Sequence, residues 1–409
     1  MKHPNIVLIS THDSGKWFGC YGHLTVHTPH LDRLADEGVV LDAYFAVSPI
    51  CSPSRGAAMT GLSPQRNGLL GLTHHGFRLH DDVPHAAALL RERGYESVLF
   101  SFQHEANESE WPRLGFERYE TPQTGDPQYP FMFRSAPEVA RGFAEFLENR
   151  SDDRPFYAQI GFNETHTPFW FGGATPDRGQ GVDIPPYLQE TPDAIHHFAG
   201  LQGAIRQADE GVGLLLEALD HQGLTEDTLV IFTTDHGIES RRDKWTLYDP
   251  GIEIAGIFRG PGIPQGKRLA DLQSNLNFLP TLFDLAGVAP LADTDGESFA
   301  SRLRKPDEPL SRETPFFGIY HNGACRCIRT QTHKLIWNLG PEPYVPPPPQ
   351  RLDGSGPATA RPLWELYDLQ TDPQEFVNLA GSAELRETES TLRGQLLDWL
   401  RKVEDPCTP

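Results

Sequence analysis

Two aspartate–histidine pairs each follow an apolar run that predicts a β-strand. The pairs are His12-Asp13, after the run Asn5–Ser10, and Asp235-His236, after the run Thr228–Thr233. If the two strands are parallel neighbours, both pairs lie at the carboxyl-terminal edge of the sheet, where ligands bind in α/β folds. A single pair is more often a helix cap beside a surface histidine. Two pairs at equivalent positions favour a shared metal ion.

A third chemical feature is the segment from Cys51 to Gly61, which reads Cys-Ser-Pro-Ser-Arg-Gly-Ala-Ala-Met-Thr-Gly. Pro53 is typical of a first helical turn, so Cys51 is expected at the start of a helix. A helix N-terminus lowers the pKa of a thiol and attracts anions. We therefore expect an activated Cys51, with Arg55 placed to hold an oxyanion.

Apolar strand-like runs alternate with amphipathic helix-like runs over residues 1–305. The strand-like runs are Asn5–Ser10, Ser97–Phe102, Phe156–Phe162, Thr228–Thr233 and Ile252–Phe258. The helix-like runs are His30–Glu37, Pro84–Arg93, Ala136–Asn149, Asp193–His221 and Leu276–Ala286. This alternation predicts an α/β fold with a large, mostly parallel sheet flanked by helices.

A second domain, residues 306–409, is expected after the linker-like segment Lys305–Pro309. Four strand-like runs and one helix predict a small antiparallel sheet with a packed helix. These are Phe316–Tyr320, Cys325–Thr330, Lys334–Asn338, Leu363–Leu369 and the helix Glu384–Lys402. The proline-rich stretch Pro341–Pro349 is expected to be an exposed loop.

The composition limits the possible partners. The 409 residues include 56 Asp and Glu against 35 Lys and Arg, a formal net charge of -21. Such a chain repels phosphate backbones, so nucleic-acid binding is not expected, and an anionic substrate needs local cations or a metal. No segment approaches the ~20 apolar residues of a membrane span. The five scattered cysteines and the lack of a signal-peptide pattern lead us to expect a cytoplasmic protein.

The motif Cys51-Ser-Pro-Ser-Arg55, followed by Met59-Thr-Gly61, resembles the signature of the sulfatase family, in which this cysteine is oxidised to formylglycine. The similarity extends along the chain, in particular to bacterial sulfatases like N-sulfoglucosamine sulfohydrolase, within the alkaline phosphatase superfamily. The other matching segments are Gly19–Gly22, Thr28–Leu34, Val230–Gly237, Leu279–Gly287 and Glu365–Leu369 with Asp372-Pro373 and Asn378–Ala380. The resemblance implies an alkaline-phosphatase-like large domain.

The resemblance also assigns roles to single residues. Cys51, as hydrated formylglycine made by a formylglycine-generating system, supplies the hydroxyl that attacks sulfur, and Arg55 holds that nucleophile. His104 takes a proton from the second hydroxyl, His166 contacts the leaving group or the sulfate, and Lys244 contacts the sulfate. The metal ligands are Asp13 and Asp235 first, then His236, and last His12, whose side chain can also point away.

Two positions depart from the family pattern. Many sulfatases have a lysine two residues before the histidine that matches His104, and this chain has Phe102. This sulfate-binding cation is therefore either absent or supplied from elsewhere, with Arg241 and Arg242 as the candidates. The usual Asp-Asp pair is His12-Asp13 here, and His236 stands where many sulfatases have asparagine. Calcium is the usual sulfatase metal and prefers oxygen ligands, whereas these histidines favour manganese or zinc.

Several other residues are weaker candidates. His74 and His75 follow the signature helix and are expected to line the substrate mouth. The aromatic and histidine side chains Trp170, Trp245 and His321 are candidates for sugar-binding walls, although packing is the commoner role of such residues. Cys325 and Cys327 share one face of a strand, which favours packing over metal binding.

Three functions remain open from the sequence. The first is a sulfatase that hydrolyses a sulfate ester, or a sulfamate, of a saccharide or related small molecule. The second is a phosphonate monoester or phosphodiester hydrolase on the same scaffold, which the histidine of the metal set and the missing lysine favour. The third is a non-catalytic sugar-binding relative, which the presence of the whole catalytic set makes the weakest of the three.

Overall fold

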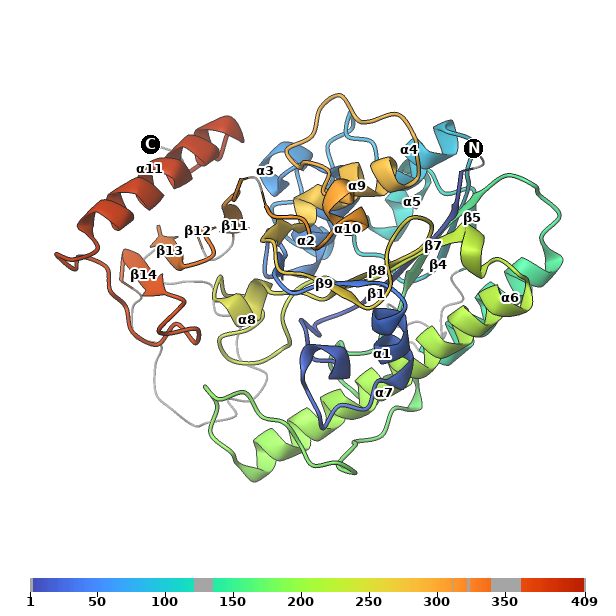
Figure 1. The fold of residues 1–409 in the computed structure, drawn as a ribbon, viewed down its shortest axis with the longest axis horizontal. Coiled ribbons are helices and arrows are strands. Elements are labelled where there is room, and N and C mark those ends of the chain that lie inside the picture. The colour runs from blue at the N-terminus through green and yellow to red at the C-terminus, as the bar shows by residue number, and fades with distance from the viewer. Residues whose placement is uncertain (1–2, 121–134, 311, 322–323, 340–361, 408–409) are drawn as a thin grey trace.

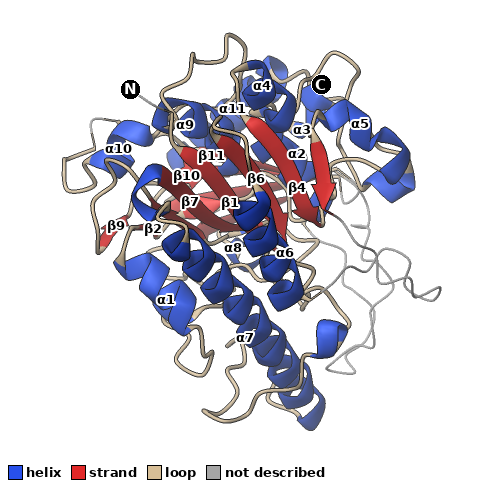
Figure 2. Cartoon of the chain, turned by 90° about the vertical axis from the view of Figure 1, so that its right-hand side faces the viewer, coloured by secondary structure: helices blue, strands red, loops and turns tan. Residues whose placement is uncertain are grey.

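An eight-stranded sheet forms the centre of the large domain, in the order β5-β4-β6-β1-β7-β8-β2-β9 (Figures 1 and 2). The computed structural model describes residues 3–120, 135–310, 312–321, 324–339 and 362–407. The strands are β1 Asn5–Thr11, β2 Val39–Leu41, β4 Glu96–Ser101, β5 Arg118–Glu120, β6 Phe156–Gly161, β7 Thr228–Thr234, β8 Gly256–Arg259 and β9 Lys267–Leu269. Only β8 runs antiparallel to its neighbours, β7 and β2. The prediction of a large, mostly parallel sheet is therefore confirmed, and β8 is its one antiparallel strand in the described residues.

Helices cover both faces of this sheet because the central strands are apolar on both sides (Figure 2). Val7 and Ile9 of β1 pack into the core beneath α1, α6 and α7, and Ile6 and Leu8 pack into the core beneath α4 and α9. The helices are α1 Pro29–Asp36, α2 Cys51–Thr60, α3 Pro64–Asn67, α4 Ala86–Glu92, α5 Trp111–Leu114, α6 Ala136–Asn149, α7 Pro192–His221, α8 Asp249–Ile252, α9 Phe278–Leu285 and α10 Ala300–Arg304.

The predicted strand Ile252–Phe258 is wrong at its beginning. Residues 249–252 form the short helix α8, and β8 begins only at Gly256. The sequence Asp249-Pro250-Gly251 explains the difference, because proline in a first turn favours a helix start and removes a donor that a central strand needs. The other predicted large-domain strands and helices agree with the structure to within about two residues at each end.

The C-terminal region forms the predicted small antiparallel sheet, in the order β11-β12-β13-β14, at one end of the molecule (Figure 1). Its elements are β11 Phe316–Tyr320, β12 Cys325–Arg329, β13 His333–Asn338, β14 Trp364–Asp368 and α11 Arg386–Lys402. Leu392, Leu396 and Leu400 of α11 pack on Ile328 and Leu335 of the sheet. The predicted loop 341–349 lies outside the described residues. The domain boundary at residue 305 stays a prediction.

A separate two-stranded parallel sheet consists of β3 Tyr44–Phe45 and β10 Gln273–Ser274, and β10 lies next to β11 of the small sheet. The backbone N–H of Ile319 in β11 donates to the carbonyl of Val47, 2.7 Å away, and so joins the small sheet to the segment before α2. Both Cys325 and Cys327 are buried in the apolar cluster at this junction, which agrees with a packing role.

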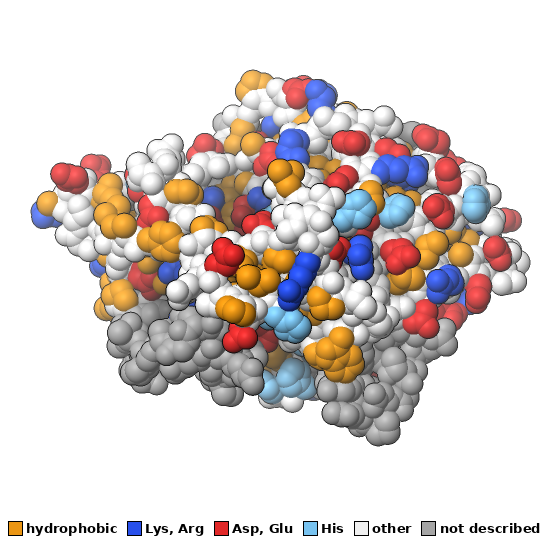
Figure 3. Space-filling model, turned by 90° about the horizontal axis from the view of Figure 1, so that it is seen from below, with side chains coloured by type: hydrophobic (Ala, Val, Ile, Leu, Met, Phe, Trp, Pro, Cys, Tyr) orange, Lys and Arg blue, Asp and Glu red, His pale blue; other side chains and the backbone are white. Residues whose placement is uncertain are grey.

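The surface charges and the helix lengths relate to the two partners that the sequence does not favour, nucleic acid and a membrane. The face seen in Figure 3 shows acidic and basic side chains interspersed over the described surface. Among the described residues, no helix combines the length and the apolar character that crossing a bilayer requires.

Candidate active site

Four neighbouring strands end at one place and deliver the predicted polar residues there. In the order β4-β6-β1-β7, the register pairs Ser101 with Gly161, Gly161 with Ser10, and Ser10 with Thr233. The loops that follow these strands carry His104, His166, His12-Asp13 and Asp235-His236 respectively. The expectation that β1 and β7 are parallel neighbours is confirmed, and it brings the two aspartate–histidine pairs together.

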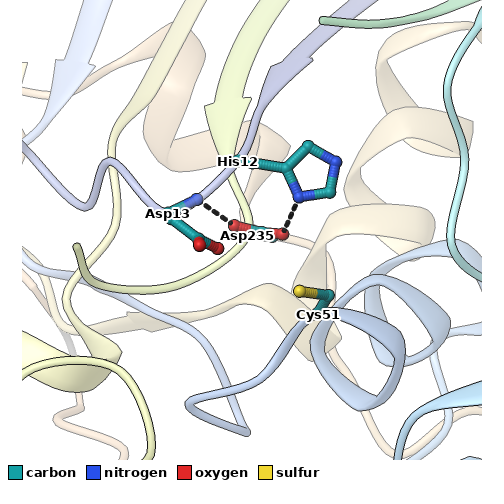
Figure 4. Close-up of side chains that lie close together, drawn as sticks. All are labelled: His12, Asp13, Cys51 and Asp235. Atoms are coloured by element: carbon teal, nitrogen blue, oxygen red, sulfur yellow. Dashed lines mark hydrogen bonds and ion pairs between the residues drawn. The ribbon is translucent and has the colours of Figure 1, made fainter. Parts of the chain in front are cut away.

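Helix α2 points its first residue, Cys51, into this cluster (Figure 4). The Cys51 Sγ lies 3.3 Å from the His236 Nε2. The helix is fixed from its next turn, because the Ser54 hydroxyl donates to the carbonyl oxygen of Asp235 over 2.5 Å. It ends at Gly61, whose φ of 68° lets the chain leave the helix at no steric cost.

The expected activation of the Cys51 thiol is wrong. Although Cys51 stands at a helix N-terminus, burial raises the pKa of its thiol well above the usual value, and Asp235 and Asp13 add to this against the opposing Lys244 charge. The unmodified residue is therefore a protonated thiol at neutral pH and a weak nucleophile. A Cys51 that takes part in chemistry needs a change in its side chain.

Arg55 is held by three contacts on the inner side of the cluster. Its Nε donates to the Asp235 Oδ2 over 3.1 Å, and its two Nη atoms donate to the Ser10 hydroxyl and the Thr11 carbonyl. Burial alone raises the pKa of Asp235, but His236 and Arg55 hold that pKa well below its usual range. Asp235 is thus a carboxylate. A cavity of about 30 Å³ is lined by Ser10, Arg55 and Asp235, and it is large enough to hold water.

Asp13 joins the metal candidates to Lys244. Its backbone has a φ of 38°, and its N–H donates to the Asp235 Oδ1 over 2.9 Å. The Asp13 Oδ2 accepts from the Lys244 Nζ at 2.6 Å, whereas its Oδ1 lies 3.1 Å from the His236 Nε2 without a hydrogen bond. The His236 Nδ1 is paired with the Gly237 carbonyl at 2.9 Å. When Nδ1 carries the proton, Nε2 presents its lone pair to a carboxylate oxygen, as in a pair of metal ligands.

His12 does not point away from the cluster. It is fully buried, and its Nδ1 lies 3.2 Å from the Asp235 Oδ2, yet neither ring nitrogen has a hydrogen bond of acceptable geometry. Burial and the Arg55 charge lower its pKa well below the usual value, so the imidazole is neutral. Ligand atoms of His12, Asp13, Cys51 and Asp235 all lie within 4.8 Å of one another. Buried ligand atoms that lack a hydrogen-bond partner fit a cation at this position.

Two histidines complete the cluster on the side of β4 and β6. Burial, with the nearby His12 and Arg55, lowers the pKa of His104, so its ring is neutral at pH 7. The exposed His74 stacks on His104 with ring centroids 5.7 Å apart, while His75 contacts His74. The His166 ring lies 5.6 Å from that of His12, and its Nδ1 is paired with the Thr167 carbonyl.

Two carboxylates near the site escaped the sequence analysis. Glu239 has its Oε2 4.0 Å from the Lys244 Nζ and lies within 4.8 Å of Asp13 and His166. The ammonium group of Lys244 already sits against these carboxylates, so a second metal ion there would have to displace it. Glu239 follows the same strand as Asp235 and was detectable by that rule. Glu105 is buried and accepts from the backbone N–H of His104 over 2.9 Å, which no sequence pattern signals.

Of the candidate substrate-binding residues, some lie beside the cluster and others do not. Trp245 is next to Lys244, with its ring 5.4 Å from the Lys244 Nζ. Arg242 turns instead to the C-terminal region, where it donates to the carbonyls of Gln374 and Glu375. Arg241 and Trp170 are exposed, and His321 contacts Phe77. The Phe102 ring packs 4.2 Å from that of His12, so the position of the missing lysine is apolar.

The fold of this chain is shared with solved structures over nearly its whole length. Two solved structures with this fold cover nearly the whole chain. One is a protein in complex with its substrate D-glucosamine-2-N,6-O-disulfate, with a TM-score of 0.78, 20% identity, and coverage of 100% of this chain and 99% of that one. The other is the phosphonate monoester hydrolase of Agrobacterium radiobacter, with a TM-score of 0.74, 22% identity and coverage of 98% and 96%.

The sequence comparisons identify the family. The sulfatase family model matches residues 4–288. An ulvan-active sulfatase of Formosa agariphila is 28% identical over 99% of this chain and 76% of its own length. Human N-sulphoglucosamine sulphohydrolase is 27% identical over 99% of this chain and 92% of its own length. The chain therefore belongs to the sulfatase family and is a sulfuric ester hydrolase.

Proposed function

We propose that this enzyme hydrolyses a sulfate ester or a sulfamate of a saccharide. The nucleophile is a formylglycine derived from Cys51, and one divalent metal ion assists. The observation that carries the proposal is the place of Cys51, whose thiol lies in one cluster with His12, Asp13 and Asp235. The names of the relatives support a saccharide substrate, since they include an ulvan-active sulfatase and an N-sulphoglucosamine sulphohydrolase.

The charges of the site support the metal. The two cations Arg55 and Lys244 face three carboxylates, those of Asp13, Asp235 and Glu239, and His12 and His104 are neutral. An anionic sulfate group is not attracted to such a site until a divalent cation reverses the balance. Asp13, Asp235 and His236 would hold the ion, with His12 as a fourth ligand. The ion supplies Lewis-acid stabilisation of the sulfate oxygens.

The remaining residues have roles that follow from their positions. A formylglycine at position 51 supplies a geminal diol, which the buried thiol does not. Arg55 and Lys244 each bind one of the two aspartates, Asp235 and Asp13 respectively, and supply the positive charge that holds an anionic substrate. The neutral His104 accepts a proton from the diol, and Glu105 fixes the backbone of its loop. His166 is placed to contact the sulfate or the leaving group.

Mass spectrometry and a substrate panel test this proposal together. The peptide that carries Cys51 is expected about 18 mass units lighter than with unmodified cysteine when the protein is made together with a formylglycine-generating system. That protein should hydrolyse an aryl sulfate and sulfated mono- and disaccharides, and Cys51→Ala should not. A modified, metal-loaded protein that hydrolyses none of these substrates refutes the proposal.

A phosphonate monoester or phosphodiester hydrolase is the second candidate. The observation in its favour is the set of candidate metal ligands, in which His236 and His12 accompany the two aspartates, together with the apolar Phe102 in place of a lysine. The ratio of kcat/KM for an aryl sulfate to that for a phosphonate monoester and a phosphodiester decides between the two.

A further inference from the structure

The loop of residues 238–248, between β7 and α8, carries Lys244 in a backbone that needs external support. Arg242 has a φ of 66° and Trp245 a φ of 72°, and both residues carry side chains that disfavour this left-handed region. Inside the large domain the loop is tied at Glu239, whose carbonyl is paired with the His197 Nε2 at 3.2 Å, and at Asp243, whose Oδ1 accepts from the Tyr187 hydroxyl over 2.5 Å. The Lys244 N–H donates to the Ile238 carbonyl over 3.0 Å, and the Trp245 N–H donates to the Pro49 carbonyl over 3.1 Å.

The small domain adds further ties at the end of the loop, through one buried lysine. The Nζ of Lys334, in β13, donates to the Leu247 carbonyl over 3.0 Å. The same Nζ lies 2.5 Å from the Asp249 Oδ1 and 2.8 Å from the Glu375 Oε1. Lys334 is 0% exposed and Glu375 is 1% exposed. Two of the four groups in this contact, the Leu247 carbonyl and the Asp249 carboxylate, therefore belong to the end of the loop and to the first residue of α8.

Two further contacts close the same connection. The Glu375 Oε2 accepts from the Asp249 N–H over 2.6 Å, and the Asp249 carboxylate also accepts from Arg329 of β12. On the other side of Lys244, the Arg242 guanidinium donates to the Glu375 carbonyl over 2.8 Å and lies 3.9 Å above the Tyr248 ring. The small domain thus holds the loop both before and after Lys244.

We propose that Lys334, Asp249 and Glu375 are positioning residues, and that through them the small domain sets the place of Lys244 in the active site. None of the three reaches the catalytic cluster in the described part of the chain. The proposal rests on the proposed function in one respect, since it takes Lys244 as a substrate contact. The groups of Cys51, Arg55 and His104 come from other elements, so loss of the connection weakens substrate binding more than it slows the chemical step.

The test compares Lys334→Met with a matched control. Lys334→Met keeps the aliphatic stem and removes the charge, and Lys334→Arg restores a cation. The control is Arg326→Met, because Arg326 forms an equally buried ion pair with Asp405, 2.7 Å from Nε to Oδ2, in the same sheet. In the described residues, the hydrogen bonds of Arg326 and Asp405 run to Cys325, Gln65 and Cys407, and none runs to the loop.

Steady-state kinetics with an aryl sulfate and hydrogen–deuterium exchange of residues 238–248 give the result. For Lys334→Met we expect KM to rise tenfold or more with kcat changed less than threefold, faster exchange in the loop, and recovery in Lys334→Arg. In a Lys244→Ala background, Lys334→Met should add no further rise in KM. Arg326→Met should keep the wild-type KM and loop exchange, even where its melting temperature falls as far.

Wild-type KM and loop exchange in a folded Lys334→Met, or equal changes in Arg326→Met, would overturn the proposal. If Lys334→Met does not fold, Glu375→Gln makes the same comparison with smaller damage, because the amide still accepts from Asp249. If the wild-type enzyme hydrolyses no sulfate ester, the proposed function fails, and the exchange data alone still decide whether the small domain holds the loop.

Discussion

Replacing His12 by leucine separates a metal ligand from an ordinary core residue. The imidazole is fully buried, and its Nδ1 lies 3.2 Å from the Asp235 Oδ2. Neither ring nitrogen has a well-formed hydrogen bond. A buried polar group without a partner costs about 1–3 kcal/mol. Without metal, His12→Leu is therefore expected to be as stable as the wild type or more stable by up to that amount.

With metal, the expected sign reverses. Removal of a group that supports a metal commonly weakens metal binding by about 10- to 100-fold. A 100-fold weaker Kd removes about 2.7 kcal/mol of metal-dependent stabilisation at saturating metal. Denaturant unfolding with and without Ca²⁺, Mn²⁺ or Zn²⁺ measures both terms, and isothermal titration measures the Kd directly.

His85 provides the control for this experiment. It is also a fully buried histidine, with its Nδ1 accepting from the Ala87 N–H, its Nε2 without a partner, and a pKa lowered to about 3 by burial. His85→Leu should leave the metal-dependent stabilisation at its wild-type value. A His12→Leu protein that is less stable without metal and binds each metal with the wild-type Kd would refute the assignment of His12 as a ligand.

Three other substitutions test the charges of the site and its supports. Glu239 lies 4.0 Å from the Lys244 Nζ, so Glu239→Gln should tighten inhibition by inorganic sulfate about 3- to 10-fold, and an unchanged inhibition constant would contradict this. Arg55→Lys keeps a charge but not three hydrogen bonds, so kcat/KM should fall about 10²- to 10³-fold, and full activity would show that the guanidinium is dispensable. Burial raises the pKa of Glu164 from 4.5 to about 7. The folded state then keeps a proton that the unfolded state releases, so stability falls as pH rises from 4.5 towards 7, and Glu164→Gln should flatten the melting temperature over that window. Glu375, whose pKa burial raises to about 7, contributes the slope that remains, and a wild-type slope in the variant would exclude Glu164 as a source.

The strands and helices of the large domain were predictable because their apolar periodicity is a local property of the sequence. Runs such as Asn5–Ser10 and Thr228–Thr233 mark strands without knowledge of their neighbours. The direction of the antiparallel strand β8 was not predictable in this way. It depends on the end of the sheet from which the chain enters β8 after α8, which is not a local property of the sequence. The short strands β2, β5 and β9 have three residues each, too few for a periodic pattern.

The site was predictable where its residues directly follow a strand, and less so elsewhere. His12, Asp13 and Asp235 come from this rule, and the resemblance at Cys51 to Arg55 supplied the nucleophile. The prediction of a lowered thiol pKa for Cys51 was wrong because the sequence shows the helix start but not the burial. Desolvation of the thiolate exceeds the effect of the helix dipole. The contacts of Arg242 were unpredictable for a similar reason, since its partners lie more than 130 residues away in the chain.

The acidic character of the chain and an anionic substrate are compatible because they act over different distances. A net charge of -21 is spread over the surface, where salt screens it within about 8–10 Å. The active-site groups are buried, so each carboxylate and cation there acts with little screening. Because the carboxylates of Asp13, Asp235 and Glu239 together outweigh the cations Arg55 and Lys244, the site is prepared for a divalent cation before it is prepared for sulfate. Metal binding and substrate binding should therefore be ordered, with affinity for sulfate appearing only in the metal-loaded protein.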